Sequence, residues 1–91
     1  MLDLDQARHL RETALARYRA RYGLLSTAEI RAIRTDLGLT QGALAAMLQL
    51  GGNTVSRWEA GRNVQTAAMD LLLRLLRDVP GSLEYLRRRA A

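Results

Sequence analysis

Apolar positions recur with the period of an α-helix along nearly the whole chain. From about residue 3 to 22, Leu10, Ala14, Tyr18 and Tyr22 return at every fourth position, which is the spacing of one helical face. No run alternates apolar and polar positions with the Val, Ile and Thr content of a strand. The pattern therefore predicts an all-α chain.

Capping residues and glycines predict where the central helices begin and end. Ser26 and Glu29 have the spacing of a capping box at the start of a second helix, which Gly38 ends. Thr40 is a candidate N-cap for a short helix through residue 48, and another short helix follows over residues 53–60. Several helices are thus expected in quick succession.

Two further helices are expected at the C-terminal end, over about residues 66–79 and from residue 82 onward, with Pro80-Gly81 between them. No linker along the chain is long enough to separate two domains. We therefore expect one compact unit of five to six helices, in which an arginine-rich helix over residues 1–23 precedes the main helical domain over residues 24–91.

The two short helices between residues 40 and 61 are joined by a tight, glycine-containing turn, a spacing that suits a helix-turn-helix. Ala45 has the small side chain that a close crossing of two helices requires. Any small helical bundle contains short helices with Ala and Leu at such spacing, so this pattern alone leaves both interpretations open.

Residues 37–61, LGLTQGALAAMLQLGGNTVSRWEAG, resemble the Xre-type helix-turn-helix family of bacterial and phage repressors, through Leu-Gly-Leu-Thr-Gln, Leu-Ala and Ser-Arg-Trp-Glu-x-Gly. A wider stretch over about residues 18–77 is similar to the C-terminal half of MqsA-type antitoxins. The resemblance implies a lambda-repressor-like DNA-binding domain that dimerises on an inverted repeat and represses its own operon beside a toxin gene.

The chain departs from those antitoxins in two places. They usually carry an N-terminal zinc module with paired CxxC motifs that grips the toxin, whereas this chain has no cysteine. It is either a fragment of a longer protein or a natural short member of the group. The second departure is in Gln49-Leu50-Gly51-Gly52, where the broader family usually has its turn glycine earlier and a polar side chain at position 52. Because glycine has no side chain, Gly52 cannot read a base.

The charge of the chain points to a polyanionic partner. All fourteen basic residues are arginine, and against nine acidic residues they give a net charge of +5. No apolar stretch approaches the length of a membrane span, and the N-terminus lacks the order of a signal peptide. We expect a cytoplasmic protein without a membrane partner.

Asn53 and Arg57 are the predicted base-reading residues. They stand four positions apart near the start of the second short helix, which enters the major groove in this family, so they share a face. Asparagine pairs bidentately with adenine and arginine with guanine. The alternative is that Asn53 only starts the helix and Arg57 is a solvated charge.

Supporting DNA contacts are expected from residues around these two. The hydroxyls of Thr54 and Ser56 flank the base readers, although such residues are also ordinary at helix starts. Phosphate contacts are expected from the start of the preceding helix and from the loop after residue 61, the alternatives being capping and a solvated loop. The residues expected there are Thr40, Gln41, Arg62 and Asn63.

Glu59 would repel DNA unless it were neutralised. In the Xre pattern an arginine four residues before a helix-ending glycine pairs with this glutamate, and Arg34 stands four before Gly38. We therefore predict a structural Arg34–Glu59 pair. Trp58 is expected in the core, because it lies three positions after Val55.

The helix over residues 66–79 carries more apolar side chains than one buried face needs. One stripe, formed by Ala68, Leu72, Leu75 and Val79, is expected to serve the core. A second stripe, Met69, Leu73 and Leu76, is then expected to form a homodimer interface, unless the N-terminal helix covers it.

Enzymatic activity is not expected. His9 is the only histidine, no two carboxylates have catalytic spacing, and a P-loop sequence is absent. Ligands for a metal are lacking too, so neither a metal nor a cofactor is predicted.

The sequence thus predicts a DNA-binding transcriptional repressor, of the antitoxin type that represses its own operon. A phage or mobile-element repressor with no toxin partner is an alternative. Another is a toxin-binding antitoxin whose arginine-rich N-terminal helix engages a protein and whose DNA binding is secondary.

Overall fold

The computed structural model describes residues 3–90, and these residues form six α-helices and no strand. The prediction of an all-α chain of five to six helices is confirmed. None of these helices is long and apolar enough to cross a membrane. In chain order the helices are α1 (Leu4–Arg21), α2 (Thr27–Asp36), α3 (Gln41–Met47), α4 (Thr54–Glu59), α5 (Ala67–Asp78) and α6 (Ser82–Ala90).

Four of the helices begin at a residue whose side chain accepts a hydrogen bond from the backbone of the first turn. Asp3 and Ser26 start α1 and α2 as full capping boxes, and Thr40 and Thr66 cap α3 and α5. Each cap pairs an amide that the helix itself leaves without a partner. The local sequence therefore fixes where these helices start.

Four helices end in a turn that requires a positive φ angle, and one of these turns lacks a glycine. The C-terminal turn of α3 has Gln49 at φ 59°, with its N–H and that of Leu50 donating to Ala46 and Ala45. This is a Schellman motif, in which glycine is the usual residue. A side chain at positive φ costs backbone energy, so α3 ends in a strained turn just before α4.

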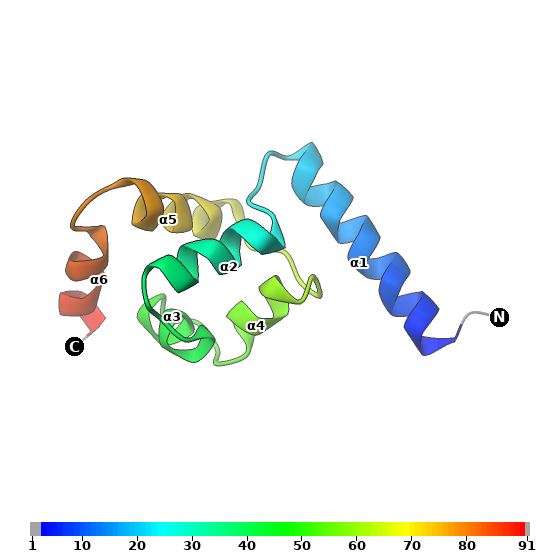
Figure 1. Ribbon diagram of the computed structural model, residues 1–91, viewed down its shortest axis with the longest axis horizontal. Helices are drawn as coiled ribbons and strands as arrows, with labels where there is room; N and C mark the ends of the chain where they lie inside the picture. Colours follow the sequence, from blue (N-terminus) through cyan, green and yellow to red (C-terminus); the bar gives the residue numbers. More distant parts are fainter. Residues whose placement is uncertain (1–2, 91) are drawn as a thin grey trace.

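The core lies between α2, α3, α4 and α5, with α6 packed against α3 and α5 (Figure 1). Ala45 is fully buried where α3 meets α4, and Trp58 is buried as predicted. The buried apolar side chains are Leu25, Ile30, Ile33, Leu44, Ala45, Leu48, Val55, Trp58, Leu73 and Leu76.

Helix α1 extends away from this bundle and contacts it mainly through one buried residue (Figure 1). The predicted helix is present, but its stripe of Leu10, Tyr18 and Tyr22 does not pack on the bundle, because each of these side chains is at least half exposed. The two tyrosine rings instead contact each other, with centroids 4.6 Å apart. The buried residue is Arg19, on another face of the helix.

The predicted dimer stripe on α5 is also incorrect. Leu73 and Leu76 are buried in the chain's own core, and Met69 is half-buried against it, so the first two offer no surface to a partner. Of the stripe expected to face the core, Leu72 packs against it, whereas Leu75 and Val79 are 44% and 48% accessible.

Asp70 explains this orientation of α5. Its carboxylate is buried beside Leu73 and accepts hydrogen bonds from the backbone N–H of Leu25 (2.8 Å) and the side chain of Gln65 (3.1 Å). Arg74 pairs with its other oxygen at 2.8 Å. The buried hydrogen bonds of Asp70 thus determine which of the two apolar stripes of α5 faces the core.

Candidate DNA-binding surface

Asn53 and Arg57 lie on the exposed side of α4, at its N-cap and in its last turn. Asn53 occupies the N-cap position of α4, but its side chain makes no capping hydrogen bond. Arg57 lies one turn further on, and its exposed guanidinium has no hydrogen bond or ion pair with any residue in 3–90. Both side chains therefore remain available to an external partner.

The neighbouring hydroxyls are less free. The Ser56 hydroxyl donates to the carbonyl oxygen of Asn53 at 2.9 Å, and both Ser56 and Thr54 are half-buried. At the start of α3, the Thr40 hydroxyl accepts the N–H of Ala43 at 3.0 Å. The hydroxyls of Ser56 and Thr40 thus already take part in the helix-turn-helix itself.

Gln41 lies between the two short helices rather than free on the surface. Its side-chain amide donates to Glu59 Oε1 at 3.1 Å, and the side chain is half-buried. This contact links the first residue of α3 to the last residue of α4. Only the second N–H of the same amide is left for a phosphate.

Glu59 is the centre of a buried ion cluster. Arg34 Nε lies 2.6 Å from Glu59 Oε2, and Arg34 Nη2 lies 3.0 Å from Oε1. Arg31 Nε adds a contact of 3.3 Å. The predicted Arg34–Glu59 pair is therefore present as a bidentate fork, which carries geometric specificity as well as energy.

This cluster neutralises the carboxylate beside the candidate surface. Burial acts to raise the pKa of Glu59, but the hydrogen bonds from Arg34, Gln41 and Arg31 outweigh it, so the pKa lies below its usual range. Glu59 is thus an anion whose charge is fully matched by donors. Arg34 also donates to the backbone oxygen of Leu39 at 3.0 Å, which fixes the entry into α3.

The loop after α4 carries the remaining predicted residues. Arg62 is exposed, and its backbone N–H caps the end of α4 by donating to Arg57 at 2.9 Å. The side-chain oxygen of Asn63 accepts the N–H of Val64 at 3.0 Å, so it shapes the loop. Arg62 therefore presents the freer side chain of the two.

Sequence reasoning missed Arg19, which ties α1 to this surface. Its guanidinium donates to the backbone oxygens of Trp58 and Asn63, at the end of α4 and in the following loop, and to Gln65. Burial lowers the pKa of Arg19, and Nη1 is buried without a hydrogen-bond partner in the described part of the chain. Nothing in the sequence distinguishes Arg19 from its neighbouring arginines.

The other missed residue, Arg31, had a visible signal. It lies three positions before Arg34 and so shares its face of α2, where both reach Glu59.

Across residues 3–90, no group of three or more His, Cys, Asp or Glu side chains is placed to hold a metal ion.

Two comparisons with known proteins agree with this geometry. The family model for helix-turn-helix proteins matches residues 30–86, from α2 to α6. Antitoxin HigA-2 of Vibrio cholerae is 31% identical over 62 residues, which make up 68% of this chain.

The chain spans 60% of the length of that antitoxin. No solved structure matches the chain. The narrower likeness to MqsA-type antitoxins stays a prediction. Because the family model covers more than half of the sequence, including both short helices and the Glu59 cluster, the chain belongs to the helix-turn-helix family.

Proposed function

We propose that this DNA-binding regulator is a sequence-specific repressor that binds an inverted repeat in double-stranded DNA as a homodimer. Membership of the helix-turn-helix family implies DNA binding. The observation that carries the specificity is the pair of exposed side chains on α4, Asn53 at the N-cap and Arg57 one turn further on. An amide and a guanidinium there match the hydrogen-bonding edges of adenine and guanine in the major groove.

The residues next to Asn53 and Arg57 can contact the sugar-phosphate backbone of the DNA. Arg62 offers an exposed cation directly after α4, and Gln41 retains one amide N–H at the start of α3. Thr40, Ser56 and Asn63 contribute mainly through hydrogen bonds that hold the helices and loop in place, whereas Thr54 is proposed as a supporting DNA contact. Base reading is therefore concentrated on Asn53 and Arg57.

The homodimer is proposed to form through the exposed apolar face of α5 and α6. Leu71 and Leu75 are 65% and 44% exposed, and Val79 and Tyr85 lie on the same apolar surface. Between α5 and α6 this surface is hollowed by a cleft of about 380 Å³, which Leu75, Val79 and Tyr85 help to line. An apolar patch of this kind usually marks an interface.

The proposed target is the protein's own operon, shared with a toxin gene. The relative from Vibrio cholerae is named an antitoxin, and an antitoxin that binds DNA is well placed to control its own synthesis. An inverted repeat upstream of the gene, with half-site centres about 34–36 Å apart, would suit a dimer with one recognition helix per half-site.

Selection of duplexes from a random pool, followed by binding titrations, tests the proposed specificity. The parent should select an inverted repeat. Asn53→Ala and Arg57→Ala should each lose about 1–3 kcal/mol of discrimination per half-site and bind selected and scrambled duplexes almost alike. Arg17→Ala, which removes an exposed arginine from α1, is the matched control and should keep the preference.

The result that overturns the assignment is equally specific. If Arg57→Ala and Asn53→Ala both keep the parent's preference, the base-reading face lies elsewhere. If the parent selects no sequence at all, the protein is not a sequence-specific repressor.

A second candidate function, docking of a toxin on α1, is favoured by the exposed side chains of that helix. Leu10, Tyr18 and Tyr22 remain about half exposed, although they have the spacing of one helical face. Removing residues 1–22 would also remove Arg19, so point substitutions are the cleaner test.

Leu10→Ser with Tyr18→Ser should abolish binding to the product of a toxin-sized reading frame beside this gene, and should leave DNA affinity within about twofold. If the doubly substituted protein still binds that product, α1 is not the docking helix.

A further inference from the structure

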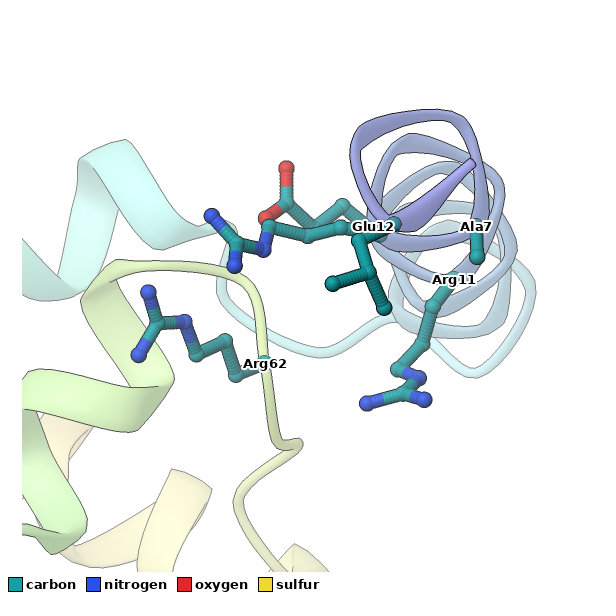
Figure 2. A pocket seen from close by; sticks show the side chains of 6 residues that line it. Ala7, Arg11, Glu12 and Arg62 are labelled. Atoms are coloured by element: carbon teal, nitrogen blue, oxygen red, sulfur yellow. The ribbon is translucent and has the colours of Figure 1, made fainter. Parts of the chain in front are cut away.

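A cleft of about 300 Å³ lies between the N-terminal half of α1 and the loop that follows α4 (Figure 2). Figure 2 shows Glu12 and Arg11 on α1, and Arg62 on the loop after α4, with the Arg62 side chain directed away from α1. The cleft is lined by Leu4, Ala7, Arg8, Arg11, Glu12 and Arg62. It therefore joins a helix and a loop that are far apart in the sequence.

The cleft has an excess of positive charge. Arg8, Arg11 and Arg62 contribute three guanidinium groups, against the single carboxylate of Glu12. None of these four side chains forms an ion pair with a residue in 3–90. An anion at the cleft would therefore meet more attraction from these cations than repulsion from the one carboxylate.

Two contacts join the two sides of the cleft. Arg19, buried at the C-terminal end of α1, donates to the backbone oxygens of Trp58 and Asn63. Nearer the cleft, Glu12 packs against Gly61, where an added Cβ would lie 3.6 Å from Glu12 Cγ. Arg8 and Arg11 therefore belong to a helix that contacts the rest of the chain through Arg19 and Glu12.

The cleft also continues directly from the recognition helix. Gly61 follows the C-cap of α4, and the backbone N–H of Arg62 donates to Arg57, one of the proposed base readers. Arg62 thus lies directly after the helical turn that carries Arg57. A guanidinium fork matches the geometry of a phosphate oxygen pair.

We propose that Arg8 and Arg11, together with Arg62, bind phosphates of the DNA backbone while α4 occupies the major groove. The inference rests on the proposed function, since it requires a duplex on α4. It adds α1, which lies outside the region matched by the family model, to the DNA-binding surface. Glu12 limits the charge excess and holds the helix against Gly61.

The salt dependence of DNA binding tests this site. In the full chain, Arg8→Gln with Arg11→Gln should lower the slope of log K against log salt by about one per protomer for each phosphate that the variant no longer binds. Affinity for selected and scrambled duplexes should fall by the same factor, because a phosphate contact carries no sequence information.

Arg17→Gln with Arg21→Gln is the matched control. It removes the same charge from the same helix, but neither residue lines the cleft, and Arg17 lies opposite Arg8 at 100° per residue. The slope for this variant should stay close to that of the parent. Circular dichroism of both variants should show the parent's helical content.

The outcomes separate this site from the proposed function. If the Arg8 and Arg11 variant keeps the parent's slope while the parent still prefers its selected duplex, the α1 site is refuted and the repressor stands. If both double variants lower the slope equally, the effect is general charge and the site is again refuted. If the parent binds no duplex preferentially, the proposed function itself fails.

Discussion

Replacing Glu59 with glutamine should strongly destabilise the protein, because it removes the one carboxylate at the centre of the α2–α4 interface. The side chain is 1% exposed and accepts hydrogen bonds from Arg34, Arg31 and Gln41. Glutamine has nearly the same shape, but it offers one acceptor oxygen and turns an N–H₂ group towards these donors.

The expected cost follows from the burial of the partners. Breaking a buried ion pair by removing one member costs about 3–5 kcal/mol. The Arg34 side chain is 15% exposed and that of Arg31 60% exposed, so water recovers part of the loss. We expect a decrease in the free energy of unfolding of about 2–4 kcal/mol, which lowers Tm by roughly 10–20 °C in a domain of this size.

Urea unfolding and thermal melts followed by circular dichroism measure this loss. Glu84→Gln is the matched control, since its ion pair with Arg87 is on the surface of α6 and is worth less than about 1 kcal/mol. Adding Arg34→Met to Glu59→Gln should cost less than the two single changes summed, because the buried cation leaves with its partner. Recovery will be partial, since Leu39 loses the donor from Arg34.

The decrease in the free energy of unfolding at acid pH, the acid limb of the stability curve, gives a second measurement of the same cluster. The pKa of Glu59 lies below its usual range, so its stabilising contribution is complete above about pH 5 and is lost as the pH falls through the folded-state pKa. Stability of the Glu59→Gln variant should therefore fall less steeply in acid than that of the parent. A variant within about 0.5 kcal/mol of the parent, the usual effect of a surface substitution, with an unchanged acid limb, would refute the reasoning.

Three further outcomes are expected. Gln49→Gly should stabilise the protein by about 0.5–1 kcal/mol in urea unfolding, because glycine adopts the φ of 59° without strain; a loss of stability would contradict this. Leu71→Glu with Leu75→Glu should give a folded monomer by light scattering, whereas Leu73→Glu should unfold the chain, since Leu73 is fully buried; a dimeric double variant would place the interface elsewhere. Asp70→Asn should flatten the acid limb too, because hydrogen bonds outweigh burial and lower the pKa of Asp70; an unchanged pH dependence of Tm would argue against it.

The features that sequence analysis predicted correctly are local ones. The capping box of Ser26 and Glu29 and the cap at Thr40 involve residues three apart, so their hydrogen bonds are formed within one turn. The Arg34–Glu59 pair spans 25 residues, and it was predictable only because a known motif fixes the two short helices relative to α2.

The features that were missed depend on long-range packing. Whether Leu73 or Leu75 faces inward depends on Asp70, whose backbone partner Leu25 lies 45 residues away. Arg19 is buried because it reaches oxygens in a loop 44 residues on, although arginine is a residue that periodicity assigns to the surface. Neither contact leaves a trace in the local pattern of apolar positions.

The anchoring of α1 near its C-terminal end makes the helix a lever. Leu4 and Arg19 are separated by fifteen residues of helix, or about 22 Å, so a tilt of about 10° at Arg19 moves the far end by roughly 4 Å. The contact of Glu12 with Gly61 limits that tilt. Small changes in packing beneath Arg19 are therefore amplified into the position of the helix's N-terminal end.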